Sequence, residues 1–312
     1  MKPTAILPYT SQRTTGADIT HISNRLNHHA PDARLLAFPD QITPIALAEP
    51  LSEQTITVTL NNNPPSPLFD FIPGPQYFAP QKTKARLVED LIAAGLPVPY
   101  TQRFSGNVTL DEAAFGPYTA IKTSAPGTFR ATGIHVFKTR DFDSLRERLM
   151  SMYRKDMKNG HVPLLQRYIP SDPHPTHTRV CTFLGSPIVC FETKAPKPFF
   201  PETLNGLAGS EATSNFSDDP TCKLVNDDAM VALAKRICAV FPEASVLSID
   251  MVRCADSGEL YCIEANMGNL CVLSARICAK LNQDLGGSAV HTQFMSYDTI
   301  ARRMVETLNG LF

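Results

Sequence analysis

Two acidic residues and an asparagine in the last quarter of the chain carry the strongest chemical signal. Asp250 lies in an apolar run, a short turn follows at 256–258, and Glu264 and Asn266 lie in a second apolar run. This pattern predicts a β-hairpin with a three-residue loop in which Gly258 takes a positive φ. In that register Asp250 faces Glu264, and Asn266 shares the face of Glu264 because strand side chains alternate.

Facing carboxylates among apolar neighbours repel one another unless positive charge lies between them. Because the donor atoms are oxygens, a hard divalent cation such as magnesium is the simplest source of that charge. The alternatives are that both carboxylates lie on a solvated face, or that a bulge shifts the register by one residue. The hairpin by itself does not decide between a metal site and a solvated face.

A lysine beside a loop of small residues forms a second candidate site. Residues 118–123 are predicted to form a strand that carries Lys122 into a loop containing Ser124, Gly127, Thr128, Thr132 and Gly133. Amides and hydroxyls of such a loop, with one ammonium, suit an anionic ligand such as phosphate. The alternative is an ordinary hairpin with a solvated lysine.

The composition indicates a globular protein of the cell interior. With 312 residues, 43% of them hydrophobic, the chain can bury a substantial core and divide into two or three subdomains. The formal charge of −1 gives no overall basic field for nucleic acid or acidic membranes. We find no charged-then-apolar leader and no apolar run long enough to cross a bilayer, so we expect a cytoplasmic protein. The eight cysteines form no C-x-x-C pair, which favours buried thiols over disulfides or zinc.

The elements that must position these residues are strands and helices in mixed order. Apolar runs in residues 1–80 predict a small α/β domain, in which His21, His28 and His29 are interpreted as surface or capping residues of an irregular segment. Apolar spacing predicts helices at 82–95, 141–158, 227–240, 270–281 and 297–311. Further strands are expected at 161–169, 179–184 and 187–194. Residues 195–220 show no periodicity, which predicts either a functional lid or a disordered stretch.

The order of these pieces resembles the ATP-grasp superfamily, and more narrowly carboxylate-amine ligases such as the D-alanine:D-alanine ligases and the ribosomal-protein glutamate ligases. The matching pieces are a helix ending in Gly-Leu-Pro-Val-Pro, the strand-borne lysine with its loop, Leu-Gln-Arg-Tyr-Ile, Thr-Arg-Val, Ile-Asp-Met-Val and Ile-Glu-Ala-Asn. They span residues 80–285. The resemblance implies an α/β (α+β) protein with a small N-terminal α/β domain, a central lid subdomain and a C-terminal antiparallel-sheet subdomain, at 1–80, 81–165 and 166–312. The nucleotide would lie between the last two.

The resemblance also implies which residues bind ATP. Lys84 stands at the family's first nucleotide lysine and Lys122 at the second. The lid loop contributes Ser124, Gly127, Thr128 and Gly133. The hinge whose backbone reads adenine matches Gln166, Arg167, Tyr168 and Ile169.

The same resemblance places the catalytic and metal residues. Arg179 stands at the family's arginine on the strand after the hinge, and Lys194 and Asn205 would face the reacting phosphate. Asp250, Glu264 and Asn266 stand at its magnesium ligands. Two magnesium ions are implied, with manganese as a substitute.

Several positions depart from the family pattern. The lid loop has only two glycines and is stiffened by Pro126, which puts its movement in question. Arg167 replaces a usual glutamate in the hinge, and Thr178 replaces a usual aspartate before the strand arginine. Ser248 lies where some ligases carry a substrate-binding arginine, so no single family substrate can be copied to this chain.

The function implied is an ATP-dependent ligase that joins a carboxylate to an amine through an acyl phosphate and releases ADP and phosphate. Its partners would be small-molecule carboxylate and amine substrates of amino-acid or peptide type, with no nucleic acid and no membrane. The alternatives are a kinase-like phosphotransferase and a non-catalytic nucleotide-binding protein. The apolar faces of 270–281 and 297–311 allow either a closed core or a homo-oligomer.

Overall fold

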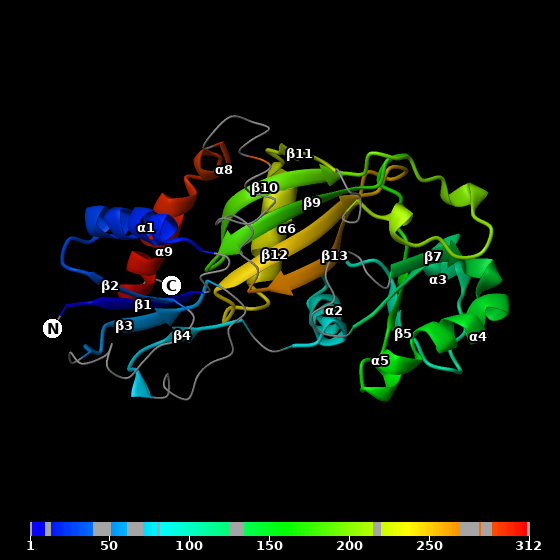
Figure 1. Ribbon diagram of the computed structural model, residues 1–312, viewed down its shortest axis with the longest axis horizontal. Coiled ribbons are helices and arrows are strands. Elements are labelled where there is room, and N and C mark those ends of the chain that lie inside the picture. The colour runs from blue at the N-terminus through cyan, green and yellow to red at the C-terminus, as the bar shows by residue number, and fades with distance from the viewer. Residues whose placement is uncertain are drawn as a thin grey trace.

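Three β-sheets lie in a row along the long axis of the protein (Figure 1). The computed structural model describes residues 2–9, 14–39, 51–60, 71–79, 82–124, 134–214, 220–268, 281 and 289–310. One sheet is parallel and the other two are antiparallel, and helices pack against all three. This arrangement confirms the predicted α/β (α+β) class.

The N-terminal sheet is parallel and has the strand order β2-β1-β3-β4. Its strands are β1 (Thr4–Tyr9), β2 (Arg34–Pro39), β3 (Thr55–Val58) and β4 (Gln76–Tyr77). Helix α1 (Gly16–His29) connects β1 to β2, as a parallel pair requires a crossover. A capping box of Thr15 and Asp18 begins this helix.

Helix α1 corrects the interpretation of its histidines. His21, His28 and His29 lie on this regular helix and not in an irregular segment. Ile22 and Leu26 are the only apolar residues that α1 buries completely, so the hydrophobic period was too weak to reveal a helix. Helix α1 also packs against α9 (Ser296–Leu308), a tertiary contact that its hydrophobic periodicity does not reveal. Tyr297 of α9 donates a hydrogen bond to Asp18 at 2.7 Å.

The central sheet has the strand order β5-β8-β6-β7 and presents two different faces. Its strands are β5 (Thr101–Arg103), β6 (Tyr118–Lys122), β7 (Ile134–Lys138) and β8 (Leu164–Arg167). One face packs on α3 (Glu112–Phe115) and α4 (Phe142–Met152), with Phe137 and Phe142 stacked at 6.0 Å. The opposite face carries Lys122, because Ile121 belongs to the α4 side and side chains alternate.

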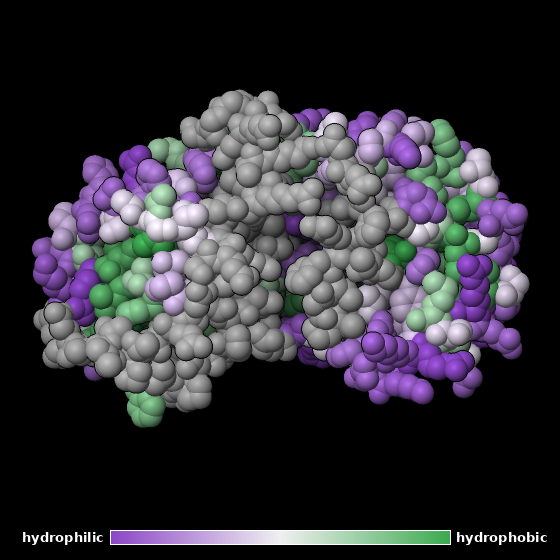
Figure 2. All heavy atoms as spheres, in the orientation of Figure 1, coloured by the Kyte–Doolittle hydropathy of each residue, from purple (hydrophilic) through white to green (hydrophobic). Residues whose placement is uncertain are grey.

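The helix predicted at 141–158 is divided. A short 3-10 turn, η3 (Thr139–Asp141), precedes α4, and α5 (Arg154–Lys158) follows it after a break at Tyr153. Tyr153 is buried, and its hydroxyl donates to the Ile121 carbonyl at 3.3 Å, so a tertiary hydrogen bond accompanies the break. Helix α5 buries no residue, and Figure 2 shows hydrophilic residues gathered over it.

The third sheet, which we call the large sheet, has the strand order β11-β10-β9-β12-β13 and is antiparallel. It lies between the N-terminal sheet and the central sheet, which is named for the central subdomain (Figure 1). Its strands are β9 (Thr176–Phe183), β10 (Ser186–Lys194), β11 (Thr221–Leu224), β12 (Val246–Arg253) and β13 (Leu260–Met267). Helices α2 (Lys84–Ala93) and α6 (Asp228–Cys238) pack on one face through an apolar core that includes Leu91, Ile237 and Ile249. The other face is polar over part of its length and elsewhere joins the core of the N-terminal sheet through Phe183 and Phe191.

Several helices share cores with elements that are distant from them in sequence. Helix α2 packs on the large sheet, and α8 (Ala289–Thr292) and α9 pack beside the N-terminal sheet and β10. Strand β8 lies within the strand predicted at 161–169. The helix predicted at 270–281 lies outside the described residues except for Leu281. Among the described residues no helix has the length and apolarity to span a membrane, and the six cysteines are free thiols.

We expect Gly74→Ala to destabilise the N-terminal sheet more than a comparable change elsewhere. Gly74 has a φ of +85°, and a Cβ there would lie 1.8 Å from the carbonyl oxygen of Thr55 in β3. Backbone strain of about 1–2 kcal/mol adds to overpacking of about 1–3 kcal/mol. Gly160 has a φ of +79° with open space around it, so Gly160→Ala adds strain alone. Urea unfolding of both variants measures the difference, and equal losses would contradict this account.

Candidate active site

The predicted pairing of Asp250 with Glu264 is confirmed, although its loop is longer than predicted. Asp250 of β12 lies opposite Glu264 of β13. At the turn, the Cys254 amide donates to the Glu259 carbonyl at 2.8 Å, so the loop enclosed by this hydrogen bond is residues 255–258, four residues and not three. Gly258 has the expected positive φ, +73°.

A β-bulge at Ile263 compensates for the extra loop residue. Met251 pairs with Cys262, whereas Asp250 pairs with Glu264, so Ile263 has no opposite residue. The carbonyl of Ile263 accepts a hydrogen bond from the Lys122 ammonium at 2.8 Å. The bulge therefore restores the register of the carboxylates and also joins the large sheet to the central sheet.

Arg179 and Asp250 form a buried bidentate ion pair at the centre of the large sheet. They lie opposite one another on β9 and β12. Arg179 Nε donates to Asp250 Oδ1 at 2.6 Å and Nη2 donates to Oδ2 at 2.7 Å. The Asp250 side chain is only 2% exposed. Burial acts to raise the pKa of Asp250, but the Arg179 guanidinium outweighs it and holds that pKa below its usual range.

Arg179, Asp250 and Glu264 form a row across β9, β12 and β13, which we call the carboxylate row. Glu264 lies at its outer end, on the edge strand β13, and has its own cation. Lys84 Nζ lies 2.7 Å from Glu264 Oε1, and the two side chains are 27% and 24% exposed. The positive charge that the facing carboxylates require is thus supplied by Arg179 and Lys84. Repulsion between the carboxylates alone no longer argues for a metal.

The donor set still fits magnesium on its open side. Glu264 and Asn266 lie next to Asp250, with Asn266 Nδ2 3.4 Å from Asp250 Oδ2. The partly exposed carboxylate of Glu264 can exchange Lys84 for a hard cation, which prefers such oxygens. Both oxygens of Asp250 already accept hydrogen bonds from Arg179, so Asp250 has only its remaining lone pairs to offer.

Lys122 lies between the central and large sheets. Its ammonium donates to Gln166 Oε1 at 3.0 Å and to the Ile263 carbonyl at 2.8 Å. Removal from water lowers the pKa of Lys122, and the nearby Glu264 carboxylate opposes that shift. An ammonium has three N–H groups, so within the described residues one remains for a ligand.

In the predicted hinge, Gln166 is held through its side chain, and Arg167 and Tyr168 are held through their backbone amides. The Gln166 side chain bridges Lys122 to Thr101, donating to Thr101 Oγ1 at 2.9 Å. The Tyr168 amide donates to the Tyr118 carbonyl at 3.0 Å, and the Arg167 amide donates to the Tyr100 carbonyl at 2.8 Å. Both amides are therefore engaged in the central sheet and are not free to read an adenine edge.

The remaining predicted residues do not join the carboxylate row. Lys194 Nζ pairs with Asp172 at 3.3 Å, and alternation along β10 puts Lys194 on the opposite face from Thr193, the partner of His177. Asn205 is exposed in the segment after β10. Ser124 is buried beside the lid loop, whereas Gly127, Thr128 and Gly133 lie outside the described residues.

His177 is a site residue that the sequence reasoning missed. Its side chain is 4% exposed, and Nε2 lies 3.8 Å from Asp250 Oδ1 while Nδ1 lies 2.5 Å from Ser214 Oγ. Burial lowers the pKa of His177, and the charge of Asp250 opposes that shift. The expected strand began at Arg179, whereas β9 begins at Thr176. A longer strand would have placed His177 on the face of Arg179.

We expect Arg179→Leu to destabilise the protein in a pH-dependent way. The variant leaves the Asp250 carboxylate buried without its cation, which costs about 3–5 kcal/mol near neutral pH. In the wild type the pKa of Asp250 is depressed, so the stabilisation is complete above about pH 4 and is lost as pH falls through the folded-state pKa. In the variant burial raises that pKa, so protonation relieves the cost.

The loss in free energy of unfolding should therefore shrink as the pH is lowered from 7.5 toward 4. Urea unfolding in the presence of EDTA measures it. The double variant Arg179→Leu/Asp250→Asn is the control, because it has no carboxylate to titrate at this position. A loss that does not change with pH would show that Arg179 stabilises by packing alone.

Comparison with known proteins gives matches in structure and none in sequence. No protein-family model and no curated protein sequence matches the chain. D-cycloserine synthetase DcsG superposes with a TM-score of 0.54 at 15% identity, covering 96% of this chain and 99% of that one. D-alanine–D-alanine ligase from Bacillus anthracis, complexed with ATP, gives a TM-score of 0.54 at 10% identity, covering 99% and 98%.

A third match is the ATP-grasp ligase PsnB in complex with a phosphomimetic variant of its minimal precursor, Mg and ADP. Its TM-score is 0.56 at 12% identity, covering 99% of each chain. The coverage includes the N-terminal sheet, which the sequence motifs did not reach. These likenesses establish the fold: the chain adopts the ATP-grasp fold over nearly its whole length.

Proposed function

We propose that the protein is an ATP-dependent ligase that activates a carboxylate as an acyl phosphate and joins it to an amine. The observation that carries this proposal is the row in which Arg179, Asp250 and Glu264 lie side by side, with Lys84 and Lys122 beside it. Three cations next to two carboxylates suit a polyphosphate, whose negative charge must be neutralised and aligned.

The chemistry explains why ATP is required. A carboxylate oxygen is a poor leaving group, so an amine does not displace it in water. Transfer of the γ-phosphoryl group to that oxygen gives an acyl phosphate and ADP, and attack by the amine then releases phosphate. These steps need charge neutralisation and orientation more than a nucleophile from the protein.

Each cation would have a distinct role in this reaction. Lys122, whose acceptors lie on both sheets, keeps one N–H among the described residues, and this group would hold the phosphates below an adenine base read by the Ile169 amide. Lys84 can leave Glu264 and pair with a phosphate, since both groups are partly exposed. Arg179 keeps Asp250 ionised and in place.

Glu264 and Asn266, with the remaining lone pairs of Asp250, are the residues that would hold magnesium. A bound magnesium ion would supply further charge neutralisation at the phosphates. Two ions and replacement by manganese are part of this proposal.

The substrates are proposed by class. One neighbour of this fold is PsnB in complex with precursor peptide PsnA2 and AMPPNP, and another is the D-cycloserine synthetase DcsG, which is named for a small molecule. For this chain we propose amino-acid or peptide carboxylates and amines. The free thiols suit a reducing compartment, and we propose the cytoplasm.

The reaction is tested with a panel of amino acids and short peptides, given singly and in pairs with ATP and magnesium. We expect ADP and phosphate to be released only when a carboxylate and an amine are both present. AMP and pyrophosphate would contradict the acyl-phosphate route. A stable phosphorylated product formed without an amine would indicate a kinase-like enzyme, and nucleotide binding without turnover would indicate a non-catalytic protein.

We expect Glu264→Gln to reduce turnover by about a hundredfold or more, because a charged ligand near the phosphates is lost. Glu259→Gln is a matched control on the same hairpin, because among the described residues the Glu259 side chain accepts hydrogen bonds only from Tyr261 and Ser257 at the exposed turn. Circular dichroism checks that both variants are folded. Equal rates for wild type and Glu264→Gln would refute the role given to this carboxylate.

A further inference from the structure

Residues 195–214, which we call the strap, leave the end of β10 and run to the central sheet (Figure 1). The strap contains two short 3-10 turns, η4 (Pro201–Thr203) and η5 (Ser210–Ala212). Its first residues are fixed to the segment before β9, since the Ala195 amide donates to Pro175 at 2.8 Å and the Phe199 amide donates to Pro173 at 2.7 Å. The sequence predicted a lid or a disordered stretch at 195–220, and the specific contacts of residues 195–214 exclude the disordered alternative for this part.

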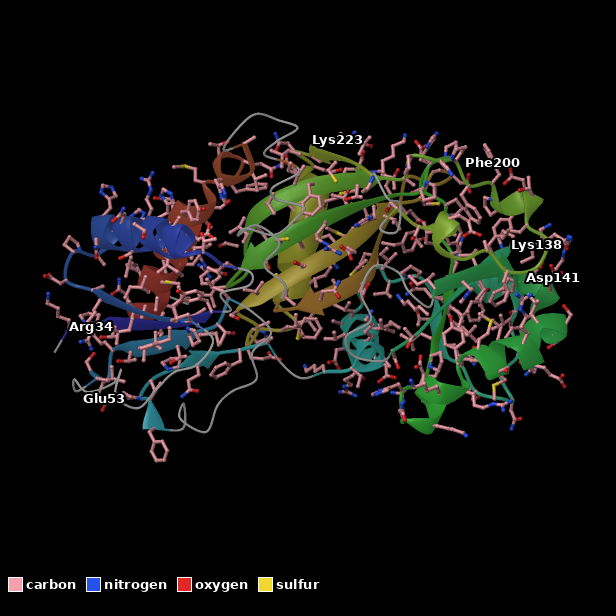
Figure 3. All side chains as sticks on the ribbon, in the orientation of Figure 1. Arg34, Glu53, Lys138, Asp141, Phe200 and Lys223 are labelled. Carbon is pink, nitrogen blue, oxygen red and sulfur yellow. The ribbon has the colours of Figure 1, made fainter. Side chains whose placement is uncertain are left out.

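The middle of the strap binds the central sheet. Ala208 and Val136 of β7 exchange two backbone hydrogen bonds, at 2.9 and 2.8 Å. Phe199, Ala208 and Ala212 pack on Val136, with further contacts to Tyr118, Ala120, Tyr168 and Leu204. Figure 3 shows Phe200 of the strap on the same side of the molecule as Lys138, the last residue of β7. The strap thus covers the face of the central sheet that also carries Lys122.

The end of the strap touches both halves of the proposed nucleotide site. The hydroxyl of Tyr168, in the hinge, donates to the Ala212 carbonyl at 3.2 Å. Two residues later, Ser214 Oγ lies 2.5 Å from His177 Nδ1. The hinge would hold the base and the row beside His177 would hold the phosphates. A segment of three residues therefore contacts the two ends of one ligand site.

His177 is placed to transmit changes between the strap and the carboxylates. It is buried between Ser214 and Asp250, and alternation along β9 puts it on the face of Arg179. When the Ser214 hydroxyl donates to Nδ1, the other ring nitrogen carries the proton and points a positive dipole toward Asp250 Oδ1 at 3.8 Å. Movement of Asp250 would thus change the electrostatic interaction of its carboxylate with the His177 ring. The same ring holds Ser214 by a hydrogen bond.

We propose that His177 is a positioning residue that couples the strap to the Arg179–Asp250 pair, so that the strap and the phosphate end of the nucleotide site become ordered together. The proposal rests on the proposed function for the identity of the ligand. Coupling between two sites is reciprocal, so occupation of the site should order the strap, and loosening of the strap should weaken nucleotide binding by the same factor.

Hydrogen exchange of the full-length protein tests the first half of this coupling. In the wild type, Mg-ADP should slow exchange in peptides covering 195–214. In Ser214→Ala this effect should be lost, and the dissociation constant for Mg-ADP should rise by roughly threefold to tenfold, the range expected for one hydrogen bond. Thr203→Ala is the control, because among the described residues the Thr203 hydroxyl bonds only to the Phe200 carbonyl of the strap, at 2.8 Å. Unchanged nucleotide-dependent protection in Ser214→Ala would overturn the proposal.

A cycle without nucleotide separates this proposal from the proposed function. As a single substitution, Asp250→Asn should speed hydrogen exchange in the strap. Added to Ser214→Ala it should have no further effect, because both changes act through His177. In His177→Asn the amide can replace Nδ1 and retain Ser214, but nothing replaces Nε2, so Asp250→Asn should again have no effect on the strap. Additive effects would overturn the coupling. If the wild type binds no Mg-ADP, the proposed function fails and this cycle still decides the coupling.

Discussion

The buried ion pair between Arg179 and Asp250 is the interaction on which the rest of the site depends. Moving two charges out of water is costly, and attraction between them repays that cost only when the geometry is good, as it is in this bidentate pair. The net contribution of the intact pair to the free energy of unfolding is therefore small, although removing one partner is costly. Its main effect is to fix the position of the Asp250 carboxylate. Glu264, Asn266 and His177 are all placed relative to that carboxylate.

Charge balance in the row also determines how a ligand can enter. Each carboxylate already has a cation, and the two cations differ in exposure: Arg179 is 11% exposed and Lys84 is 27% exposed. The inner pair resists exchange because breaking it leaves a buried charge, whereas the outer pair is worth little in water. Binding of a polyphosphate would thus be an exchange of partners at Glu264 around a fixed centre. With this division, the inner carboxylate would orient the site while the outer one changes its partner.

The sequence predicted what local patterns determine and failed where tertiary contacts decide. The pairing of Asp250 with Glu264 came from alternation about a glycine turn, and it held because the bulge at Ile263 offset one extra loop residue. No local pattern signals such a bulge. Helix α1 was missed because only two of its apolar residues are fully buried, and His177 was missed because the apolar run of β9 is preceded by polar residues that still pair in the sheet. The strap has no period at all, since its order comes from contacts with β7 and Tyr168.

The bulge at Ile263 limits how the two ATP-grasp sheets can separate. Its carbonyl and Gln166 Oε1 together hold the ammonium of Lys122, which comes from the central sheet. Separating the two sheets would remove an acceptor from a buried ammonium that has little water to replace it, which is costly. The strap adds a second connection between the same two sheets. These two connections constrain the side of the protein at which we propose that the nucleotide binds.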